Sequence, residues 1–198
     1  LFLWLHNSTI NTGFNERICE SLMNGPHCVV DMGFENLMEE REVKNTISQL
    51  INACSHNKHC AEPFHLTFTD LEKDKYSHIQ LSHYLPKCYI KTEANFMDIF
   101  PSENLIYLTP DSPNEMKVYD PEAIYIIGGM VDLSSRGAVT LAKAKKLQIR
   151  TARFPIDRYL LWEKGSKYLT LNQVFSILHT IKDSGDWLQA FRHIPQRK

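Results

Sequence analysis

Short apolar runs rich in β-branched and aromatic residues alternate along this chain with longer stretches of helical periodicity. The runs are CVVDM from Cys28, FHLTFTD from Phe64, CYIKT from Cys88, NLIYLTP from Asn104, AIYIIGGM from Ala123 and IRTARF from Ile149. Strands that are apolar throughout and separated by helices are typical of a parallel sheet covered on both faces. The sequence therefore predicts an α/β fold, a parallel sheet with helices on both faces.

Helical periodicity is clearest where apolar residues recur three and four positions apart. The stretches with this spacing are 35–53, 76–84, 138–147, TLNQVFSILHTIKDSG from Thr170 and the short DWLQAFRHI near the end. Thr170 and Gln173 form a capping-box pattern, in which each side chain bonds the other's backbone N–H, so a helix is predicted to begin there.

Length and composition limit the broad class. A chain of 198 residues is within the range of one domain, so we expect a single domain over 1–198. No apolar stretch approaches the roughly 20 residues of a membrane span, and we expect no membrane partner. Five cysteines are an odd number, which argues against a disulfide framework and for a reducing compartment. Because the chain does not begin with Met, we expect a fragment whose targeting sequence lies outside it.

The overall charge gives no indication of a nucleic-acid partner. The formal net charge is −1, so a protein that binds RNA would need its basic groups clustered or supplied by another segment. One such cluster is Lys143, Lys145, Lys146, Arg150, Arg153 and Arg158. A solvated helix face is the ordinary explanation for such a run. This one, however, surrounds the loops that follow three of the expected strands.

Three of the expected strands end in unusual loops: LTPDSPN from Leu108, GGMVDLSSRG from Gly128 and RFPIDRYL from Arg153. Ligands bind beyond the carboxyl ends of parallel strands, and glycines such as Gly128 and Gly129 let backbone approach a ligand. The alternative is that these are ordinary turn residues. Neither a GxGxxG after the first strand nor a P-loop is present, so the residues alone indicate only a nucleoside pocket.

The segment CSHNKHC places two cysteines and two histidines between Cys54 and Cys60. This composition could hold zinc, but the spacing matches no usual structural zinc pattern. The segment also has the character of a helix end running into a loop. We therefore expect no metal site from the sequence.

The segments YLTPDSPN, YIIGGMVD and KYLTLNQVFSIL resemble the tRNA purine-nine N1-methyltransferases, a branch of the SPOUT superfamily. The resemblance covers nearly the whole chain, from VVDMGFENLM to WLQAFRHIPQRK, with several motifs in order. LAKAKKL, DRYLLWEKGSKYLTLNQ and IPQRK look closer to the mitochondrial branch, the methyltransferase subunit of protein-only mitochondrial RNase P, than to its nuclear and cytosolic relatives.

This resemblance implies a SPOUT-type fold with a C-terminal trefoil knot whose loops hold the cofactor. It implies transfer of a methyl group from S-adenosylmethionine, leaving S-adenosylhomocysteine, to N1 of guanine or adenine at tRNA position nine. It further implies a monomeric catalytic domain, a preceding basic tRNA-binding region absent here, and location in the mitochondrial matrix. The implied partners are tRNA or its precursor, a short-chain dehydrogenase and the nuclease that trims tRNA 5′ ends.

The resemblance also implies roles for particular residues. Asp132 would be the general base that guanine N1 requires. The alternative is that Asp132 is an ordinary turn or helix-capping residue. Asn45 and Gln49 lie four apart on one helix face and could pair with a purine edge; Asp31 could orient that face, bind substrate or cap a helix. The cofactor residues would be Leu108, Thr109, Gly129, Leu133, Ser134, Ser135, Arg136, Gly137, Phe154, Pro155, Leu169, Leu171 and Asn172.

Two other functions remain open at this point. The first is a tRNA-binding scaffold whose methylation is secondary or lost, and the second is an unrelated α/β nucleotide-binding module. Replacing Asp132 by Asn separates the enzyme from the scaffold, because a scaffold would still support tRNA cleavage. A module of the second kind would not bind S-adenosylmethionine.

Overall fold

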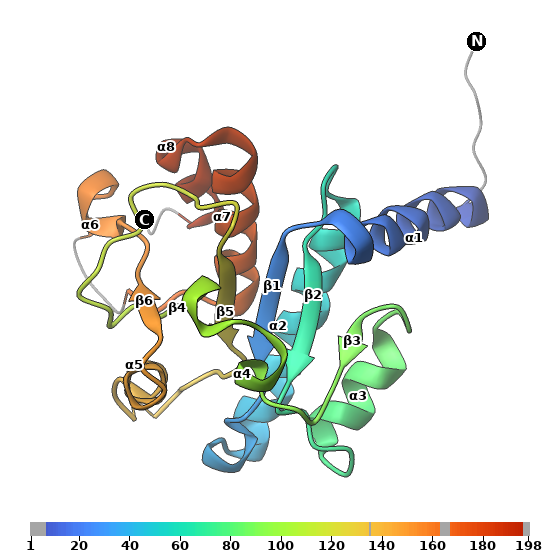
Figure 1. The fold of residues 1–198 in the computed structure, drawn as a ribbon, viewed down its shortest axis with the longest axis horizontal. Helices are drawn as coiled ribbons and strands as arrows, with labels where there is room; N and C mark the ends of the chain where they lie inside the picture. Colours follow the sequence, from blue (N-terminus) through green and yellow to red (C-terminus); the bar gives the residue numbers. More distant parts are fainter. Residues whose placement is uncertain (1–6, 135, 163–166, 196–198) are drawn as a thin grey trace.

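The computed structural model describes residues 7–134, 136–162 and 167–195, and it contains one six-stranded sheet (Figure 1). The strands, in spatial order, are β3 (Ile90–Lys91), β2 (His65–Thr69), β1 (His27–Asp31), β5 (Ile124–Gly128), β4 (Leu105–Leu108) and β6 (Arg150–Ala152). Every neighbouring pair is parallel, which confirms the predicted α/β class. The register pairs Leu108 with both Ile127 and Ala152, so the carboxyl ends of β4, β5 and β6 lie at one edge.

Helices cover both faces of this sheet. They are α1 (Asn7–Asn24), α2 (Glu40–His59), α3 (Tyr76–Tyr84), α4 (Phe96–Ile99), α5 (Val139–Lys146), α6 (Ile156–Tyr159), α7 (Leu171–Ser184) and α8 (Trp187–Ala190), with 3-10 turns η1 (Glu35–Leu37), η2 (Ser102–Asn104) and η3 (Phe191–His193). No helix in the described ranges combines the length and apolar character needed to cross a membrane.

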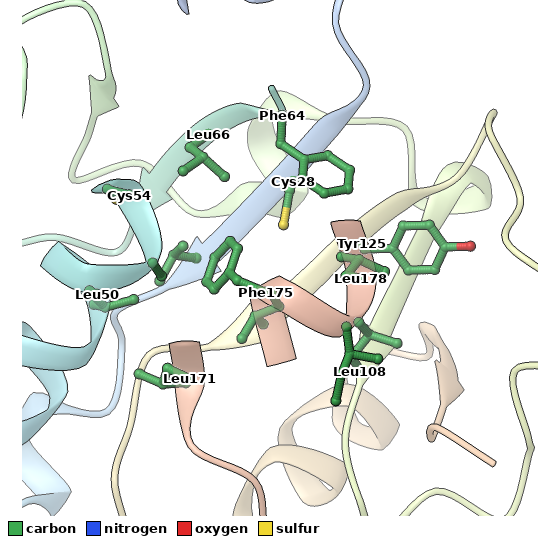
Figure 2. Packing of buried hydrophobic residues seen from close by; sticks show 14 of the residues in the cluster. Cys28, Leu50, Cys54, Phe64, Leu66, Leu108, Tyr125, Leu171, Phe175 and Leu178 are labelled. Carbon is green, nitrogen blue, oxygen red and sulfur yellow. The ribbon is translucent and has the colours of Figure 1, made fainter. Parts of the chain in front are cut away.

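Alternation along β1 divides the core between the two faces. Cys28 and Val30 belong to the larger cluster, formed with α2 and α7, while Val29 belongs to a smaller cluster with Ala144 of α5. Figure 2 shows Phe175 of α7 in the larger cluster, beside Cys28 and Leu50. Phe175 is fully buried, and truncating such a side chain to Ala costs about 3–5 kcal/mol.

The ends of α2 differ from the sequence prediction for a local reason. The helix begins at Glu40 because Glu39 and Glu42 form a reciprocal capping box, and the residues before it form η1 and an extended N-cap. It then continues past Ala53 to His59. The capping box predicted for Thr170 and Gln173 is present at the start of α7. Helix α1 was not predicted, because few of its side chains are apolar; Ile18 is one that it buries.

Candidate active site

A cavity of about 660 Å³ opens at the carboxyl ends of β4, β5 and β6, at the edge where the three predicted loops meet. The lining consists of Gln49 of α2 and most residues of the segments 108–113, 127–132, 137–140, 152–157 and 167–174. Small-molecule sites in proteins are commonly cavities of about 300–1,000 Å³ with mostly apolar walls and a few polar groups. This cavity has the size and position of a site for a nucleoside-sized ligand.

Hydrogen bonds hold the loop after β4 against β6 and α5. The Thr109 N–H donates to Ala152 O at 2.9 Å, and the hydroxyls of Thr109 and Thr140 are 2.8 Å apart. The Arg153 guanidinium donates to Ser112 O at 2.6 Å and pairs with Glu115. These contacts are made within the protein, so this wall of the cavity is fixed before any ligand binds.

The start of α7 is joined to α2 at the opposite wall. The Leu171 N–H, which has no partner within its own helix, donates to Gln49 Oε1 at 2.8 Å. The Gln49 amide oxygen therefore already accepts one hydrogen bond at the cavity. Gln49 thus lines the cavity and also fixes where α7 begins.

Asp132 lies in the cavity wall, where its own loop bonds its carboxylate. Oδ1 accepts the Ser134 N–H at 3.0 Å, and Oδ2 accepts the Arg136 N–H at 2.6 Å. The Arg136 guanidinium also lies 3.1 Å from Oδ1. The Asp132 side chain is 22% exposed, so a substrate can still reach it.

Glu42 is a buried member of this network that sequence reasoning missed. Its side chain is only 2% exposed. It pairs with Arg136 at 2.8 Å and accepts the Leu133 N–H at 2.8 Å. The hydrogen bond from Arg136, followed by that from the Glu39 N–H, lowers the pKa of Glu42 to about 2. Glu42 therefore stays ionised and anchors Arg136, and with it the loop carrying Asp132. The capping box with Glu39 was the pattern that could have identified it.

Asp31, expected to bind substrate or to orient the helix face, does not line the cavity. Its carboxylate is fully buried, 2.7 Å from Lys143 Nζ, and it accepts the Tyr107 hydroxyl at 2.8 Å and the Gly33 N–H at 3.0 Å. Burial raises the pKa of Asp31, while the Lys143 ammonium opposes that rise. With its oxygens committed to internal donors, Asp31 supports the fold.

Gly129 is also outside the cavity lining, and its role differs from the one expected. A Cβ at Gly129 would lie 2.6 Å from Met32 Sδ and 3.1 Å from Asp31 O. A side chain at this position would therefore disturb the packing against β1. Its neighbour Gly128 does line the cavity, and a Cβ there would lie 2.8 Å from the Thr140 methyl group.

The other expected cofactor residues divide into two groups. Those that line the cavity are Leu108, Thr109, Gly137, Phe154, Leu169 and Leu171. Those in the same loops but outside the lining are Leu133, Ser134, Arg136, Pro155 and Asn172. Ser135 lies outside the described residues. Asn45 is exposed one turn before Gln49 and does not line the cavity.

Several lining residues were absent from the sequence prediction, including Pro110, Asp111, Val139 and Tyr168. The Tyr168 hydroxyl donates to Asp111 at 3.0 Å, a contact between loops 57 residues apart. This bond raises the pKa of Tyr168. Asp111 lay within the loop PDSPN that the sequence singled out, but nothing local indicated its partner.

The basic cluster does not form one free basic surface in the structure. Lys143 pairs with Asp31 and Asp70, while Arg153 and Arg158 pair with Glu115. Lys145 and Lys146 are exposed at the end of α5. Part of the local positive charge is therefore neutralised internally.

Comparison with known proteins agrees with this geometry. The crystal structure of full-length spTrm10 in complex with SAH matches with a TM-score of 0.74 and 30% identity, over 87% of this chain and 99% of that chain. Human tRNA methyltransferase 10 homolog C is 38% identical over 203 residues, covering 100% of this chain and 50% of the relative. The Drosophila melanogaster mitochondrial ribonuclease P protein 1 homolog is 38% identical over 205 residues, covering 100% of this chain and 46% of the relative.

The fold, with its cavity at the carboxyl edge of the sheet, is therefore that of the Trm10 structures. The family model for tRNA (guanine(9)-N(1))-methyltransferase TRM10/TRM10A matches residues 11–198, and the chain belongs to that family. The chain spans about half the length of the curated relatives it matches.

Proposed function

We propose that this protein uses S-adenosylmethionine to methylate N1 of a purine at tRNA position nine, releasing S-adenosylhomocysteine. The observation that carries the proposal is the cavity at the ends of β4, β5 and β6, in a fold matching the SAH complex of spTrm10. Family membership supports the tRNA substrate and the modified atom.

The residues of the cavity fit this cofactor. S-adenosylmethionine supplies an activated methyl group on a sulfonium. Leu108, Leu169 and Leu171 offer apolar side chains for an adenine ring, while the loops after β4 and β5 offer backbone groups for its polar edge. The enzyme's main task is to align the methyl group with the attacking nitrogen.

Asp132 is the proposed general base. Guanine N1 carries a proton, which must pass to the Asp132 carboxylate as the N1–methyl bond forms. Arg136 and Ser134 hold this carboxylate in one orientation, and because Oδ2 accepts only the Arg136 N–H among the described residues, it has a lone pair left for the guanine N1–H. Adenine N1 has a free lone pair and depends less on this residue. Asn45 and the Gln49 NH₂ group are the proposed contacts to the purine edge.

We also propose a trefoil knot in the C-terminal part of the chain. The segment after β4 is bridged to β6 by Glu115 and Arg153, and Trp187 of α8 donates to Lys117 O in the same segment. This arrangement puts the β4–β5 connection against the C-terminal helices. A crystal structure tracing the path from Leu160 to Thr170 tests whether the chain passes through that loop.

The name of the Drosophila melanogaster relative, mitochondrial ribonuclease P protein 1 homolog, supports a wider role as a subunit of mitochondrial RNase P, and the sequence resemblance implies the mitochondrial matrix as its location. The proposed partners are precursor tRNA, a short-chain dehydrogenase and the protein-only nuclease. A tRNA-holding scaffold with little methylation is the second candidate, favoured by the Asp132 carboxylate being occupied by Arg136. Reconstituted 5′ cleavage of precursor tRNA, with and without this protein, measures that role.

The first experiment is a calorimetric titration of S-adenosylmethionine into the chain and into Leu169→Trp. An indole at Leu169 would fill part of the cavity, so we expect saturable binding that weakens at least 100-fold in the variant, because the displaced contacts are worth on the order of several kcal/mol. Leu161→Trp is the matched control, since Leu161 is fully exposed and outside the lining. Equal binding by both variants, or none by the folded parent chain, would exclude this cavity as the cofactor site.

A further inference from the structure

Three potential metal ligands lie close together where α2 and α7 run away from the active-site cavity. His56 of α2, Cys60 at the end of α2 and His179 of α7 place one ligand atom each within 4.8 Å of one another. In the sequence, only the segment around Cys60 indicates metal ligands, and no metal site was predicted from it. The third side chain comes from more than a hundred residues further along, which local spacing could not show.

The hydrogen bonds around His179 fix which of its nitrogens is free. The Asn57 amide is oriented by its neighbours: its NH₂ donates to Phe64 O at 3.1 Å and to the Tyr89 hydroxyl at 3.2 Å, and its oxygen accepts the Phe64 N–H at 2.8 Å. His179 Nε2 lies 2.7 Å from that same oxygen and must therefore donate a hydrogen to it.

The other nitrogen, Nδ1 of His179, then carries a bare lone pair. His179 is 2% exposed, and within the described residues this Nδ1 has no hydrogen-bond partner. Burial disfavours the charged imidazolium, so the ring is neutral. Metal-binding histidines characteristically donate their second N–H to a carbonyl or carboxylate oxygen, which fixes the tautomer and the ring orientation. Asn57 does this for His179.

The separation of the ligand atoms suits a tetrahedral ion. With Zn–S about 2.3 Å and Zn–N about 2.0 Å, tetrahedral zinc places a thiolate sulfur about 3.5 Å from an imidazole nitrogen. Cys60 Sγ lies 3.7 Å from His56 Nδ1. Cys60 caps α2 one turn after His56, and the three ligand atoms, all within 4.8 Å of one another, come together by rotation of the His56 and Cys60 side chains.

We propose that His56, Cys60 and His179 form a zinc site that joins the C-terminal end of α2 to α7. Two imidazoles and one thiolate are a ligand set that zinc prefers, and water takes the fourth position on the solvent-facing side of His56. On binding, the Cys60 S–H bond breaks, an S–Zn bond forms and the proton passes to solvent.

The site would act on the cavity through the two helices. Gln49 and Leu171 join α2 to α7 at the cavity, and the zinc ligands join them again roughly 10–12 Å further along, given about 1.5 Å of rise per residue. Two cross-links hold a helix pair more firmly than one. Zinc is therefore expected to stiffen the wall of the active-site cavity without touching either substrate.

The test is a titration of Zn²⁺, and separately of Co²⁺, into the metal-free chain. We expect one equivalent to bind and the melting temperature to rise, with a thiolate-to-cobalt absorption band in the Co²⁺ form. Cys60→Ser and His56→Gln are expected to weaken binding at least 100-fold, and Cys60→Ser to abolish that band. His59→Gln and Cys19→Ser are the matched controls, because both residues are exposed and outside the cluster.

His179→Gln extends the test into the core. If that variant fails to fold, the partly exposed positions His56 and Cys60 still decide the question. The proposal is overturned if the parent chain binds no zinc, or if Cys60→Ser and His56→Gln bind it as tightly as the parent. Retained binding in the two control variants supports it.

Discussion

Asp31 is the last residue of β1 and Asp132 lies in the loop after the neighbouring strand β5, yet the surroundings of the two carboxylates are opposite. Asp31 is fully buried and paired with Lys143. Asp132 is 22% exposed, and its partner Arg136 is itself anchored by Glu42. A buried carboxylate whose oxygens are all committed serves the fold, because freeing it would leave a charge without water. A carboxylate at a cavity edge, held by its own loop, can exchange a partner for a ligand.

Asp132→Asn is expected to have the largest effect. An amide cannot accept the guanine N1 proton, so methylation of a G9 tRNA should fall by about 10³-fold, within the range for loss of a general base. Single-turnover methyl transfer on G9 and A9 transcripts measures it, with the A9 substrate expected to lose less. Unchanged G9 methylation would remove Asp132 from the chemistry and favour the scaffold.

Lys143→Met tests the other member of the pair. It leaves the Asp31 carboxylate buried without its cation, and we expect a loss of about 3 kcal/mol in the free energy of unfolding. Urea denaturation measures this loss. Lys145→Met on the same helix is the control, since Lys145 is exposed and a surface change of this kind stays within about 0.5 kcal/mol.

A loss below that of the control would show that Asp31 is protonated in the folded protein. The two aspartates would then differ in their protonation state and not in their ion pairing.

The smallest effect concerns the anchor of Arg136. The pKa of Glu42 is about 2 in the fold, against an ordinary value of 4.5. A carboxyl whose pKa is lowered by folding adds stability that is complete above the unfolded pKa and is lost as pH falls through the folded pKa. We therefore expect the stability difference between the parent and Glu42→Gln to be constant above about pH 5 and to shrink toward pH 2.

Thermal melts across this pH range measure the effect, with Glu16→Gln on the exposed side of α1 as the control. A difference that does not change with pH would mean that Glu42 acts by shape alone and not by charge.

Periodicity was sufficient to predict the sheet strands and the principal helices, because burial on both faces leaves continuous apolar runs in the sequence. Helix α1 escaped prediction since its buried stripe is narrow. For the site, the loops after β4, β5 and β6 were correctly expected to meet. The sequence could not show contacts between distant residues. These are the ion pairs of Lys143 with Asp31 and of Arg136 with Glu42, and the proximity of His179 to Cys60.

The larger hydrophobic cluster has a consequence for synthesis of the chain. Phe175 of α7 lies beside Cys28 and Leu50 in this cluster (Figure 2), so these two residues cannot be fully packed until α7 has been made. At roughly 5–20 residues per second, the ribosome needs on the order of 10 s to make the intervening chain. Throughout that delay the apolar face of β1 and α2 is uncovered, which makes the nascent protein a natural client for chaperones.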